Sequence, residues 1–369
     1  MPLKICHVTS LHSPDDTRIF YKECCSLAHY YDVTLIAPNV TNYRKNGVNV
    51  VGVKLSKSRF KRLAHLNVVL KKALEIDADI YHFHDPELIS IGLKIKKYGK
   101  KVIFDSHEDV PAQILGKQYI PKLLRRPLSY LYSYYEKRHL SQYDALVTVT
   151  PHIVERFNKI NSNTEMITNF PVVNDKITER KSISFQDRHY VCFIGAVTPH
   201  YRHKFIINAL ENCNVKYLLA GPVEDSYLEE LKSLKGWDKV DYRGIVPAED
   251  VYIYMDQSFA GLVIPEYRPN AGFKRGTIGI LKMYEYMLAG IPVIATDFDL
   301  WKEIIEGNEC GICVNPFSAQ EVTDAINFYL LNPETAKKHG ENGRRAVLEH
   351  YSWATQESKL IELYRRLVN

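Results

Sequence analysis

The feature that most constrains the fold is an alternation of short apolar, β-rich runs with longer amphipathic segments of helical period, and this alternation occurs twice. Parallel strands joined by crossover helices produce this pattern, because both faces of their sheet are covered. We therefore expect two doubly wound α/β domains. The expected strands of the first are residues 5–9, 33–37, 50–53, 79–83, 102–105 and 145–149, and those of the second are 190–194, 215–220, 240–243, 260–264, 292–295 and 311–314.

The 369 residues suit two domains rather than one. We place the first at residues 1–174 and the second at 175–352, with a helix at 353–369 that returns to the first. The connection at 169–189 is polar and carries a proline. Two such domains facing each other leave a cleft at the carboxyl ends of both sheets, so we expect functional groups on the loops that follow strands.

Composition excludes several classes of protein. The chain is 46% hydrophobic and 25% charged, which is typical of a globular protein. We find no apolar run of about 20 residues and no secretory leader, so we expect a cytoplasmic protein. Seven cysteines, an odd number, argue against a disulfide framework, and the single CxxC pair has no second pair to complete a zinc site.

The net charge of +5 is unevenly distributed. Residues 1–175 carry 25 Lys and Arg against 17 Asp and Glu, whereas the remainder carries 23 against 26. The basic half suits an anionic partner, either a membrane or a nucleic acid. Two segments, residues 54–74 and 121–140, combine basic side chains with apolar ones at helical spacing. They resemble interfacial helices, although packing of the apolar face on the first sheet would explain the pattern equally well.

Two phosphate-binding signatures are missing, since the first strand is followed by neither G-x-G-x-x-G nor a Walker A motif. The most informative segment is residues 272–298. A glycine-rich stretch there precedes a helix expected at 280–288, and backbone amides at a helix N-terminus suit a diphosphate. Lys282 and Glu285 share a face of this helix, so one can meet phosphate and the other a ribose diol.

Five blocks of sequence, in order, resemble the retaining GT-B glycosyltransferases of family 4, the group 1 transferases. They are ICHVTSLHSPDDTRIFYKECCSLAHYYDVTLIAPN, HFHDPELISIGLKIKKYGKKVIFDSHED, ITNFP, LKMYEYMLAGIPVIATDF and YSW. The resemblance implies a GT-B fold, with two Rossmann-like domains across a cleft. It also implies transfer of a hexose or N-acetylhexosamine from a nucleotide sugar, UDP most commonly, to a saccharide or lipid-linked acceptor.

The resemblance implies that Glu285 binds the ribose of the donor, as the second Glu of the family's Glu-x7-Glu motif. The first Glu is replaced here by Thr277. The Thr277 hydroxyl and the amides of Gly276 and Ile278 are candidate donor contacts, and Glu266 is an alternative source of the missing carboxylate.

Basic residues after the first strand of the second domain neutralise the departing diphosphate in the family. Here Gly195 is followed by Ala196, so the first basic position is missing. Arg202 matches the later one, and its planar fork suits phosphate oxygens. Lys204 is a weaker candidate, because a surface lysine at a helix start is common.

In the first domain the resemblance assigns His107 a place beside the acceptor and the donor sugar. Arg18 matches a recurrent arginine that faces phosphate, although it could instead pair with Asp15 or Asp16. We interpret His84 and Asp85 as loop architecture, with Asp85 helping to start a helix. The nucleotide base is expected at the backbone of three residues in the second domain, Gly244, Ile245 and Val246.

Catalysis is then electrostatic, with His107, Arg202 and Glu285 as its principal residues and no cofactor. Asp297 and Asp299 have the spacing of an Asp-x-Asp motif, but in the family this position follows the signature helix, so we expect no metal. A nucleotide-sugar 2-epimerase or hydrolase of the same fold is an alternative. A nucleic-acid-binding protein is a third possibility, although the basic stretches match no RRM, KH or helix-turn-helix signature, and we expect no nucleic-acid partner.

Overall fold

The computed structural model describes residues 3–56, 58, 66–117, 119–174, 177 and 183–368. Parts of the basic segment at 54–74 and of the connection at 169–189 lie outside the described residues. The chain divides into two compact units. Unit 1 comprises Met1–Asn169 together with Trp353–Asn369, and unit 2 comprises Phe170–Ser352.

Unit 1 is built on an eight-stranded sheet of order β3-β4-β2-β1-β5-β6-β7-β8, parallel except for the β3–β4 pair. All six expected strands are present. The two additional strands, β3 and β8, are three residues long and only partly buried, so they lack the apolar run that marks the others. The strands are β1 Lys4–Val8, β2 Asp32–Pro38, β3 Tyr43–Lys45, β4 Val48–Val53, β5 Ile80–Phe83, β6 Lys101–Ser106, β7 Ala145–Thr148 and β8 Thr164–Met166.

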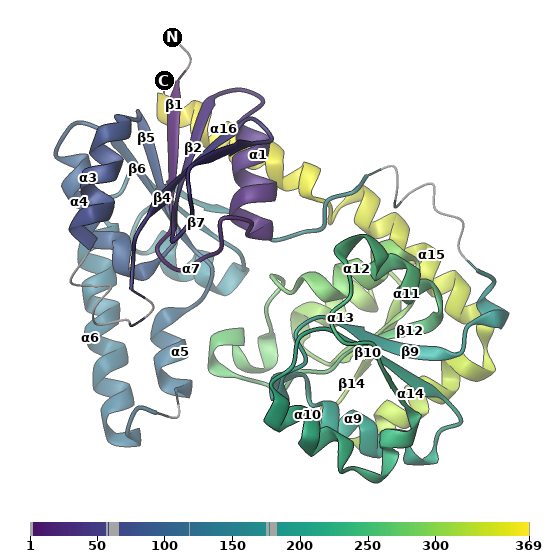
Figure 1. Ribbon diagram of the computed structural model, residues 1–369. Helices are drawn as coiled ribbons and strands as arrows, with labels where there is room; N and C mark the ends of the chain where they lie inside the picture. Colours follow the sequence, from purple (N-terminus) through teal and green to yellow (C-terminus); the bar gives the residue numbers. More distant parts are fainter. Residues whose placement is uncertain are drawn as a thin grey trace. The chain divides into compact units, whose positions relative to one another are not determined.

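Helices cover both faces of this sheet (Figure 1). Successive strand residues alternate between two apolar clusters, so that Cys6 and Val8 pack with one layer of helices and Ile5 with the other. The first layer is α3 Leu66–Ile76, α4 Ile89–Lys96, α6 Lys122–Leu140 and α7 Pro151–Asn158, and the second is the π-helix η1 Thr17–Cys24, α1 Cys25–Leu27 and α16 Trp353–Val368. The short elements η2 (Pro86–Leu88) and α5 (Val110–Gly116) follow strands β5 and β6.

Unit 2 has a six-stranded, wholly parallel sheet of order β11-β10-β9-β12-β13-β14. Every strand of the second series was expected, and the bounds differ by at most two residues at either end. The strands are β9 Tyr190–Ile194, β10 Lys216–Ala220, β11 Val240–Tyr242, β12 Ser258–Val263, β13 Val293–Thr296 and β14 Gly311–Val314. Both units are therefore Rossmann-like α/β domains, as the alternating pattern predicts.

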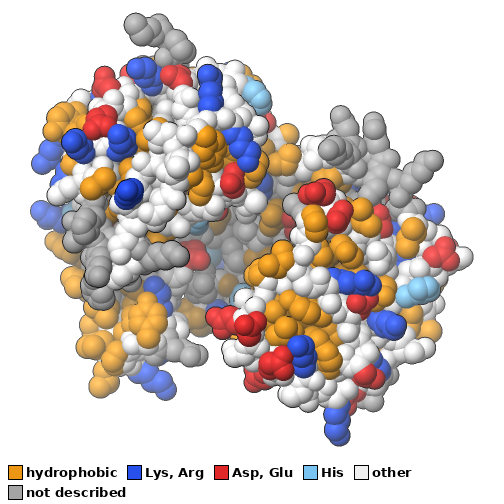
Figure 2. Space-filling model, in the orientation of Figure 1, with side chains coloured by type: hydrophobic (Ala, Val, Ile, Leu, Met, Phe, Trp, Pro, Cys, Tyr) orange, Lys and Arg blue, Asp and Glu red, His pale blue; other side chains and the backbone are white. Residues whose placement is uncertain are grey.

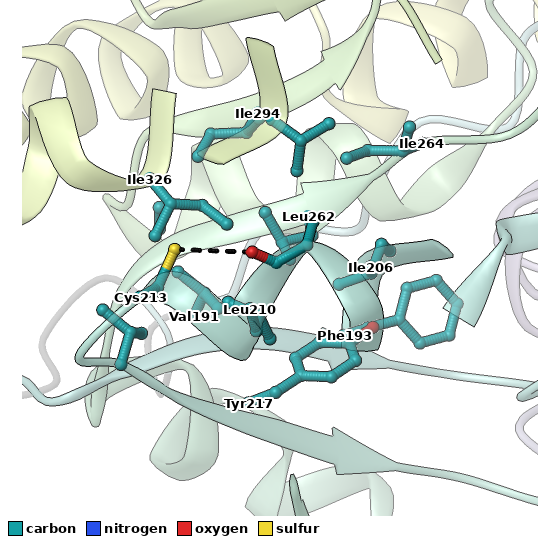
Figure 3. Close-up of a cluster of buried hydrophobic side chains, with 14 of the residues drawn as sticks. Val191, Phe193, Ile206, Leu210, Cys213, Tyr217, Leu262, Ile264, Ile294 and Ile326 are labelled. Atoms are coloured by element: carbon teal, nitrogen blue, oxygen red, sulfur yellow. Dashed lines mark hydrogen bonds between the residues drawn. The ribbon is translucent and has the colours of Figure 1, made fainter. Parts of the chain in front are cut away.

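Two apolar layers also enclose the second sheet. Figure 3 shows the layer in which strand residues such as Val191 and Leu262 meet Ile206 and Ile326 from the helices. This layer includes α9 His203–Ala209, α10 Asp225–Lys232 and α14 Ala319–Leu331. The opposite layer includes α11 Val251–Asp256, α12 Leu281–Ala289, α13 Asp299–Ile305 and most of α15 Pro333–Glu349.

All seven cysteines are free thiols, as their odd number suggested. Cys313 lies in β14 and Cys310 immediately before it, so the CxxC pair belongs to a strand of the core. Across the residues that the structure describes, we find no helix with both the length and the apolar character needed to cross a bilayer.

Buried histidines make the stability of the fold depend on pH. Burial lowers the pKa of His203 on α9 to about 3, although its Nδ1 lies 3.0 Å from the Tyr217 hydroxyl. The unfolded chain binds a proton at this residue near pH 6.5, so acidification favours unfolding. We expect the free energy of unfolding to fall by about 2 kcal/mol per such histidine between pH 6.5 and 5.

Denaturant unfolding at several pH values checks this expectation. His203→Gln should reduce the slope of stability against pH, whereas His29→Gln, at an exposed position, should leave it unchanged. Equal slopes for both variants and the natural protein would contradict the assignment.

Candidate functional site

In unit 2 the carboxyl end of β9 meets the first turn of α12. Lys282 of α12 points inward, and its Nζ donates a hydrogen bond of 2.9 Å to the carbonyl of Ile194, the last residue of β9. The next residue is Gly195, with φ 146°, where a Cβ would lie only 1.6 Å from the Lys282 Nζ. The glycine therefore leaves room for the lysine at the end of the strand.

Burial lowers the pKa of Lys282, and the nearby carboxylate of Glu285 offsets part of that effect. The ammonium also lies over the ring of Phe193, 5.0 Å from its centroid. Lys282 and Glu285 were expected to share a helix face, and both are half-buried there rather than solvated. An anion bound beside Lys282 would stabilise its charged form, because the amine has lost part of its hydration.

The turn that leads into α12 has a fixed geometry. Gly276 has φ 81°, and a Cβ there would lie 2.5 Å from the Cβ of Phe298. The Thr277 carbonyl accepts a hydrogen bond of 2.6 Å from Trp301 Nε1, and the Gly279 amide lies 3.2 Å from Thr277 Oγ1. The half-buried Ile278 packs against the neighbouring core. The expected anion-binding turn is thus held in place by Phe298 and Trp301, two aromatic residues that follow β13.

Arg202 and Glu266 form an ion pair at the same edge of the sheet. Arg202 Nη1 lies 2.6 Å from Glu266 Oε1, and the guanidinium stacks over the exposed ring of Phe317 at 4.9 Å. Arg202 adopts the left-handed conformation, φ 57°, between the turn η4 (Pro199–Tyr201) and α9. Lys204, by contrast, pairs with Glu230 of α10 on the surface, and its role toward a donor stays a prediction.

The expected base-reading segment follows β11. Gly244 has φ 64°, and its carbonyl accepts a hydrogen bond of 2.7 Å from the Gly221 amide after β10. The Ile245 side chain is 77% exposed, and Val246 packs partly on the core. The loop is therefore held to the loop after β10 through backbone atoms. Contacts of this kind depend little on which side chains are present, so they are hard to identify from the sequence.

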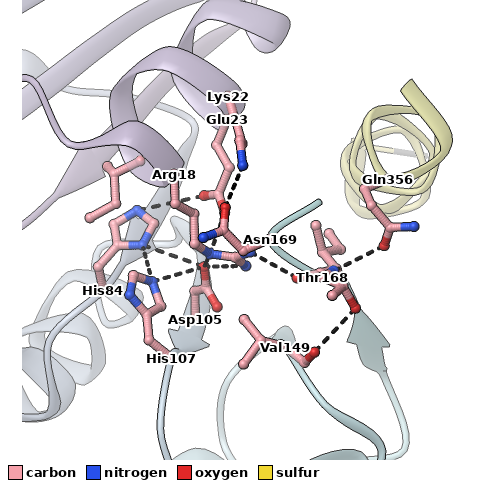
Figure 4. A network of polar contacts seen from close by, with 12 residues as sticks. Arg18, Lys22, Glu23, His84, Asp105, His107, Val149, Thr168, Asn169 and Gln356 are labelled. Atoms are coloured by element: carbon pink, nitrogen blue, oxygen red, sulfur yellow. Dashed lines mark hydrogen bonds and ion pairs between the residues drawn. The ribbon is translucent and has the colours of Figure 1, made fainter. Parts of the chain in front are cut away.

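In unit 1 the structure gives Arg18 other partners than Asp15 or Asp16, and its role toward a donor phosphate stays a prediction. The guanidinium is buried and engaged by protein groups (Figure 4). Its Nη2 lies 2.9 Å from Asp105 Oδ2, its Nε 3.0 Å from Glu23 Oε1, and its Nη1 donates to the Ile167 carbonyl at 2.8 Å. Neither Asp15 nor Asp16 receives the side chain; Asp16 instead caps η1 through the backbone amides of Arg18 and Ile19.

Asp105, the last but one residue of β6, connects Arg18 to His107. The His107 Nε2 lies 3.2 Å from Asp105 Oδ2 and 3.4 Å from His84 Nδ1. Burial alone would raise the pKa of Asp105, but Arg18 and His107 outweigh it and hold that pKa well below its usual range. Burial raises the pKa of Glu23 well above its usual value, against the attraction of Arg18. Asp105 is therefore the carboxylate that stays ionised, and it fixes His107 after the strand.

A cavity of about 1230 Å³ opens at this edge of the unit 1 sheet. Loops after β1, β5 and β6 give it a polar wall, and α5 and α6 give it an apolar one. The polar wall includes His12, His84, Asp85, Glu87, Ser90, His107 and Glu108, and the apolar wall includes Val110, Ile114, Ile120, Leu128, Leu131, Tyr132 and Tyr135. An amphiphilic ligand would find both of its halves matched here.

Asp85 has a different role from the helix start that we expected. No helix amide bonds to its side chain. Instead Asp85 Oδ2 accepts hydrogen bonds from Thr9 Oγ1 at 2.8 Å and from the Ser10 amide at 2.6 Å. It therefore holds the loop after β1 against the loop after β5, at the polar wall of the cavity.

Two sets of side chains have donor atoms that could hold a metal. One is His84, Asp105 and His107, and the other is His7, Glu23, His82 and His84, whose ligand atoms lie within 4.8 Å of one another. In unit 2, Asp297 is bound by Lys274 and Tyr267, and Asp299 is the first residue of α13. That no metal takes part stays a prediction.

Asp105, which contacts His107, was not expected from the sequence, and neither were the buried polar residues Glu23, His7 and His82. Asp105, His7 and His82 each lie in a strand whose other residues are mostly apolar, and Glu23 lies on the buried face of η1. A charged or titratable residue inside such an apolar run was the available signal, because an ionisable group is buried only when it has partners.

Comparison with known proteins finds one family model for each of the two Rossmann-like domains. A family model described as Glycosyltransferase Family 4 matches residues 24–170, and one described as Glycosyl transferases group 1 matches residues 175–346. An uncharacterised glycosyltransferase of Methanocaldococcus jannaschii is 25% identical over 367 residues, covering 91% of this chain and 90% of the relative.

Two further proteins extend the comparison. The alpha-galactosylglucosyldiacylglycerol synthase of Streptococcus pneumoniae is 24% identical over 316 residues, 78% of each chain. The solved structure of HepE from Anabaena in complex with UDP superposes with a TM-score of 0.68 at 14% identity, covering 99% of this chain and 100% of the other. With one family model on each of its Rossmann-like domains, this chain is a GT-B glycosyltransferase of the family 4 type.

Proposed function

We propose that this enzyme transfers a hexose or N-acetylhexosamine from a nucleotide sugar, with its diphosphate bound where α12 meets β9. The observation that carries the proposal is the inward-pointing Lys282, half-desolvated at the Gly195 turn. A diphosphate there would meet the Lys282 ammonium, the backbone amides that precede α12 and the positive end of the helix dipole. UDP is the nucleotide that we favour for the donor. It is the commonest one in the family that the chain resembles, and it is bound in the HepE structure.

In this proposal the ion pair between Arg202 and Glu266 breaks when the donor binds. Arg202 is neutralised by its ion pair with Glu266. A bound diphosphate would compete for the guanidinium, and the released Glu266 carboxylate would then be available to a sugar hydroxyl, in place of the missing first Glu of the motif. Thr277 is the alternative, through a hydroxyl held at the α12 entry. Glu285, one turn beyond Lys282, would accept hydrogen bonds from the ribose diol.

The chemistry that this arrangement supports is electrostatic stabilisation of the leaving group. As the bond from the anomeric carbon to the diphosphate breaks, negative charge grows on the phosphate oxygens, and Lys282, Arg202 and the amides before α12 face that charge. These groups supply the neutralisation for which other enzymes use a metal, so we expect transfer to proceed with a chelator present. We further propose retention of the anomeric configuration, as in the family that the chain resembles.

The acceptor in this proposal occupies the cavity of unit 1, with its reacting hydroxyl beside His107. The polar wall would bind a saccharide and the apolar wall would bind a hydrocarbon, so a lipid-linked saccharide is the acceptor class that fits both. The named activity of the pneumococcal relative, a glycosyldiacylglycerol synthase, is consistent with such an acceptor.

The donor site is tested by Glu285→Gln. Loss of the charged acceptor should weaken binding of the preferred nucleotide sugar about tenfold to a hundredfold, since a hydrogen bond to a charged group contributes roughly 1.5–3 kcal/mol. Calorimetric titration with a panel of UDP- and GDP-sugars measures the affinity. Glu229→Gln on α10 is the matched control, because Glu229 is exposed and pairs with Lys232 one turn further along the same helix.

Unchanged donor affinity in Glu285→Gln would remove the ribose role. In a separate transfer reaction with acceptor, NMR of the first-formed product should show the anomer of the donor, and an inverted anomer would reject retention. Consumption of the donor without any acceptor would instead favour the epimerase or hydrolase alternative.

We also propose that α6 rests on an anionic membrane surface, the cytoplasmic leaflet being the anionic one. Of the 19 residues of α6, only Glu136 and Leu140 are buried, so packing on the sheet does not explain its apolar side chains. Leu123 is 90% exposed and Leu131 62%, and the basic Lys122 and Arg126 are exposed on the same helix. Figure 2 shows hydrophobic and basic side chains side by side over this part of unit 1.

Helix α3 does not support the same role. It buries Leu66, Val69 and Ala73 against the sheet, so its apolar face is accounted for by packing. The basic residues that precede it lie mostly outside the described residues. The membrane proposal therefore rests on α6. This helix also forms part of the apolar wall of the cavity, so a lipid-linked acceptor could enter the cavity from the bilayer on which α6 rests.

Flotation with liposomes of phosphatidylglycerol tests the membrane proposal. The natural protein should float with them and be released by salt, because part of the attraction is electrostatic. Leu123→Glu combined with Leu131→Glu should abolish flotation. Leu331→Glu on α14, where the leucine is 76% exposed, is the matched control and should float normally. Equal flotation of both variants, or none of the natural protein, would contradict the proposal.

A further inference from the structure

A row of buried polar rings runs through unit 1 from the C-terminal helix to His84. The His82 Nδ1 lies 2.9 Å from the Tyr364 hydroxyl, which lies 3.1 Å from His7 Nε2. The His7 Nδ1 in turn lies 2.9 Å from His84 Nε2. These groups come from β5, α16, β1 and the loop after β5, and all four are buried.

The histidines of this row are neutral at pH 7. Burial lowers the pKa of His84 to about 4, although Asp105 opposes the shift. Burial, together with a neighbouring histidine, lowers the pKa of His7 and of His82 well below the usual value. A neutral imidazole donates from one nitrogen and accepts at the other, so each contact in the row carries a single proton.

The end groups fix the direction in which these protons point. His84 Nδ1 lies 3.6 Å from Asp105 Oδ2, and the carboxylate favours a proton on that nitrogen. His84 Nε2 then accepts from His7, His7 Nε2 accepts from the Tyr364 hydroxyl, and that oxygen accepts from His82 Nδ1. In the opposite direction His82 Nε2 would carry a buried proton for which the described structure offers no acceptor, whereas in the first direction the same nitrogen keeps only an unpaired lone pair.

We propose that Tyr364 is a positioning residue for His107, acting through His7, His84 and Asp105. With the His84 proton on Nδ1, the Asp105 carboxylate is surrounded by donors and holds the His107 Nε2 proton. His107 then keeps its Nδ1 lone pair as an acceptor for a substrate hydroxyl. This inference rests on the role of His107 in the proposed function, and it gives the returning helix α16 a part in the chemistry.

A metal in the same place would break the row. A metal held by His7, Glu23, His82 and His84 would take one ring nitrogen of His7 as a ligand, and both nitrogens of His7 already contact members of the row. The two arrangements exclude each other, so metal content is one arm of the test.

The test is Tyr364→Phe, which keeps the ring and removes the hydroxyl. Nitrogen-15 NMR of labelled histidines, assigned with His84→Gln, should show the Nδ1–H form of His84 in the natural protein and a mixture of both forms in Tyr364→Phe. In Tyr364→Phe the kcat for release of UDP from the preferred UDP-hexose should fall about tenfold, and the KM for the donor should be unchanged. Tyr31→Phe is the control, since that ring lies 6.2 Å from the Tyr364 ring and outside the row.

The outcomes separate this inference from the proposed function. A natural His84 spectrum and an unchanged kcat in Tyr364→Phe would overturn it, as would stoichiometric zinc in the purified natural protein. A natural rate in His107→Asn would instead remove the role proposed for His107. If Tyr364→Phe were too unstable to study, the Nε2–H form of His84 in the natural protein would by itself contradict the inference.

Discussion

The hydrogen bond from Lys282 to the Ile194 carbonyl determines how α12 meets the carboxyl edge of the second sheet. An amine held there requires a glycine at position 195 and places the first turn of α12 over the end of β9. Because all six strands are parallel, the other loops after strands reach the same edge. Arg202, Glu266 and the turn at Gly276 therefore lie at the same edge of the sheet as a half-desolvated cation, and that cation is what makes this edge suited to a diphosphate.

The first domain solves a different electrostatic problem in its core. Two carboxylates, Glu23 and Asp105, are buried beside one guanidinium, that of Arg18. One cation stabilises one anion well, so Asp105 keeps its charge while the raised pKa of Glu23 favours the protonated form. The result is a fixed negative charge directly behind His107. The loop that carries His107 is thus positioned by a buried charge pair.

Much of this could be predicted from the sequence, because local pattern determines it. Apolar runs marked every strand of the second sheet, and the glycine-rich turn was correctly placed before the helix that carries Lys282 and Glu285. The partners of Arg18 were out of reach, since Asp105 lies 87 residues away and Ile167 149 residues away. Such pairings depend on the fold, which brings the end of β6 and the residue after β8 to η1. For the same reason the sequence left open whether the apolar side chains of α6 pack on the sheet or face a membrane. Only the fold shows which residues of this helix are buried.

The most direct test of the account is hydrogen exchange of the full-length protein with and without UDP-hexose. Amides of residues 276–289 should exchange more slowly when the nucleotide sugar is bound, because the phosphates would accept hydrogen bonds from the turn before α12 and hold the helix in place. The free hexose should have no such effect. Protection confined to other segments, with residues 276–289 unchanged by a nucleotide sugar that binds, would contradict the placement of the donor and the mechanism built on it.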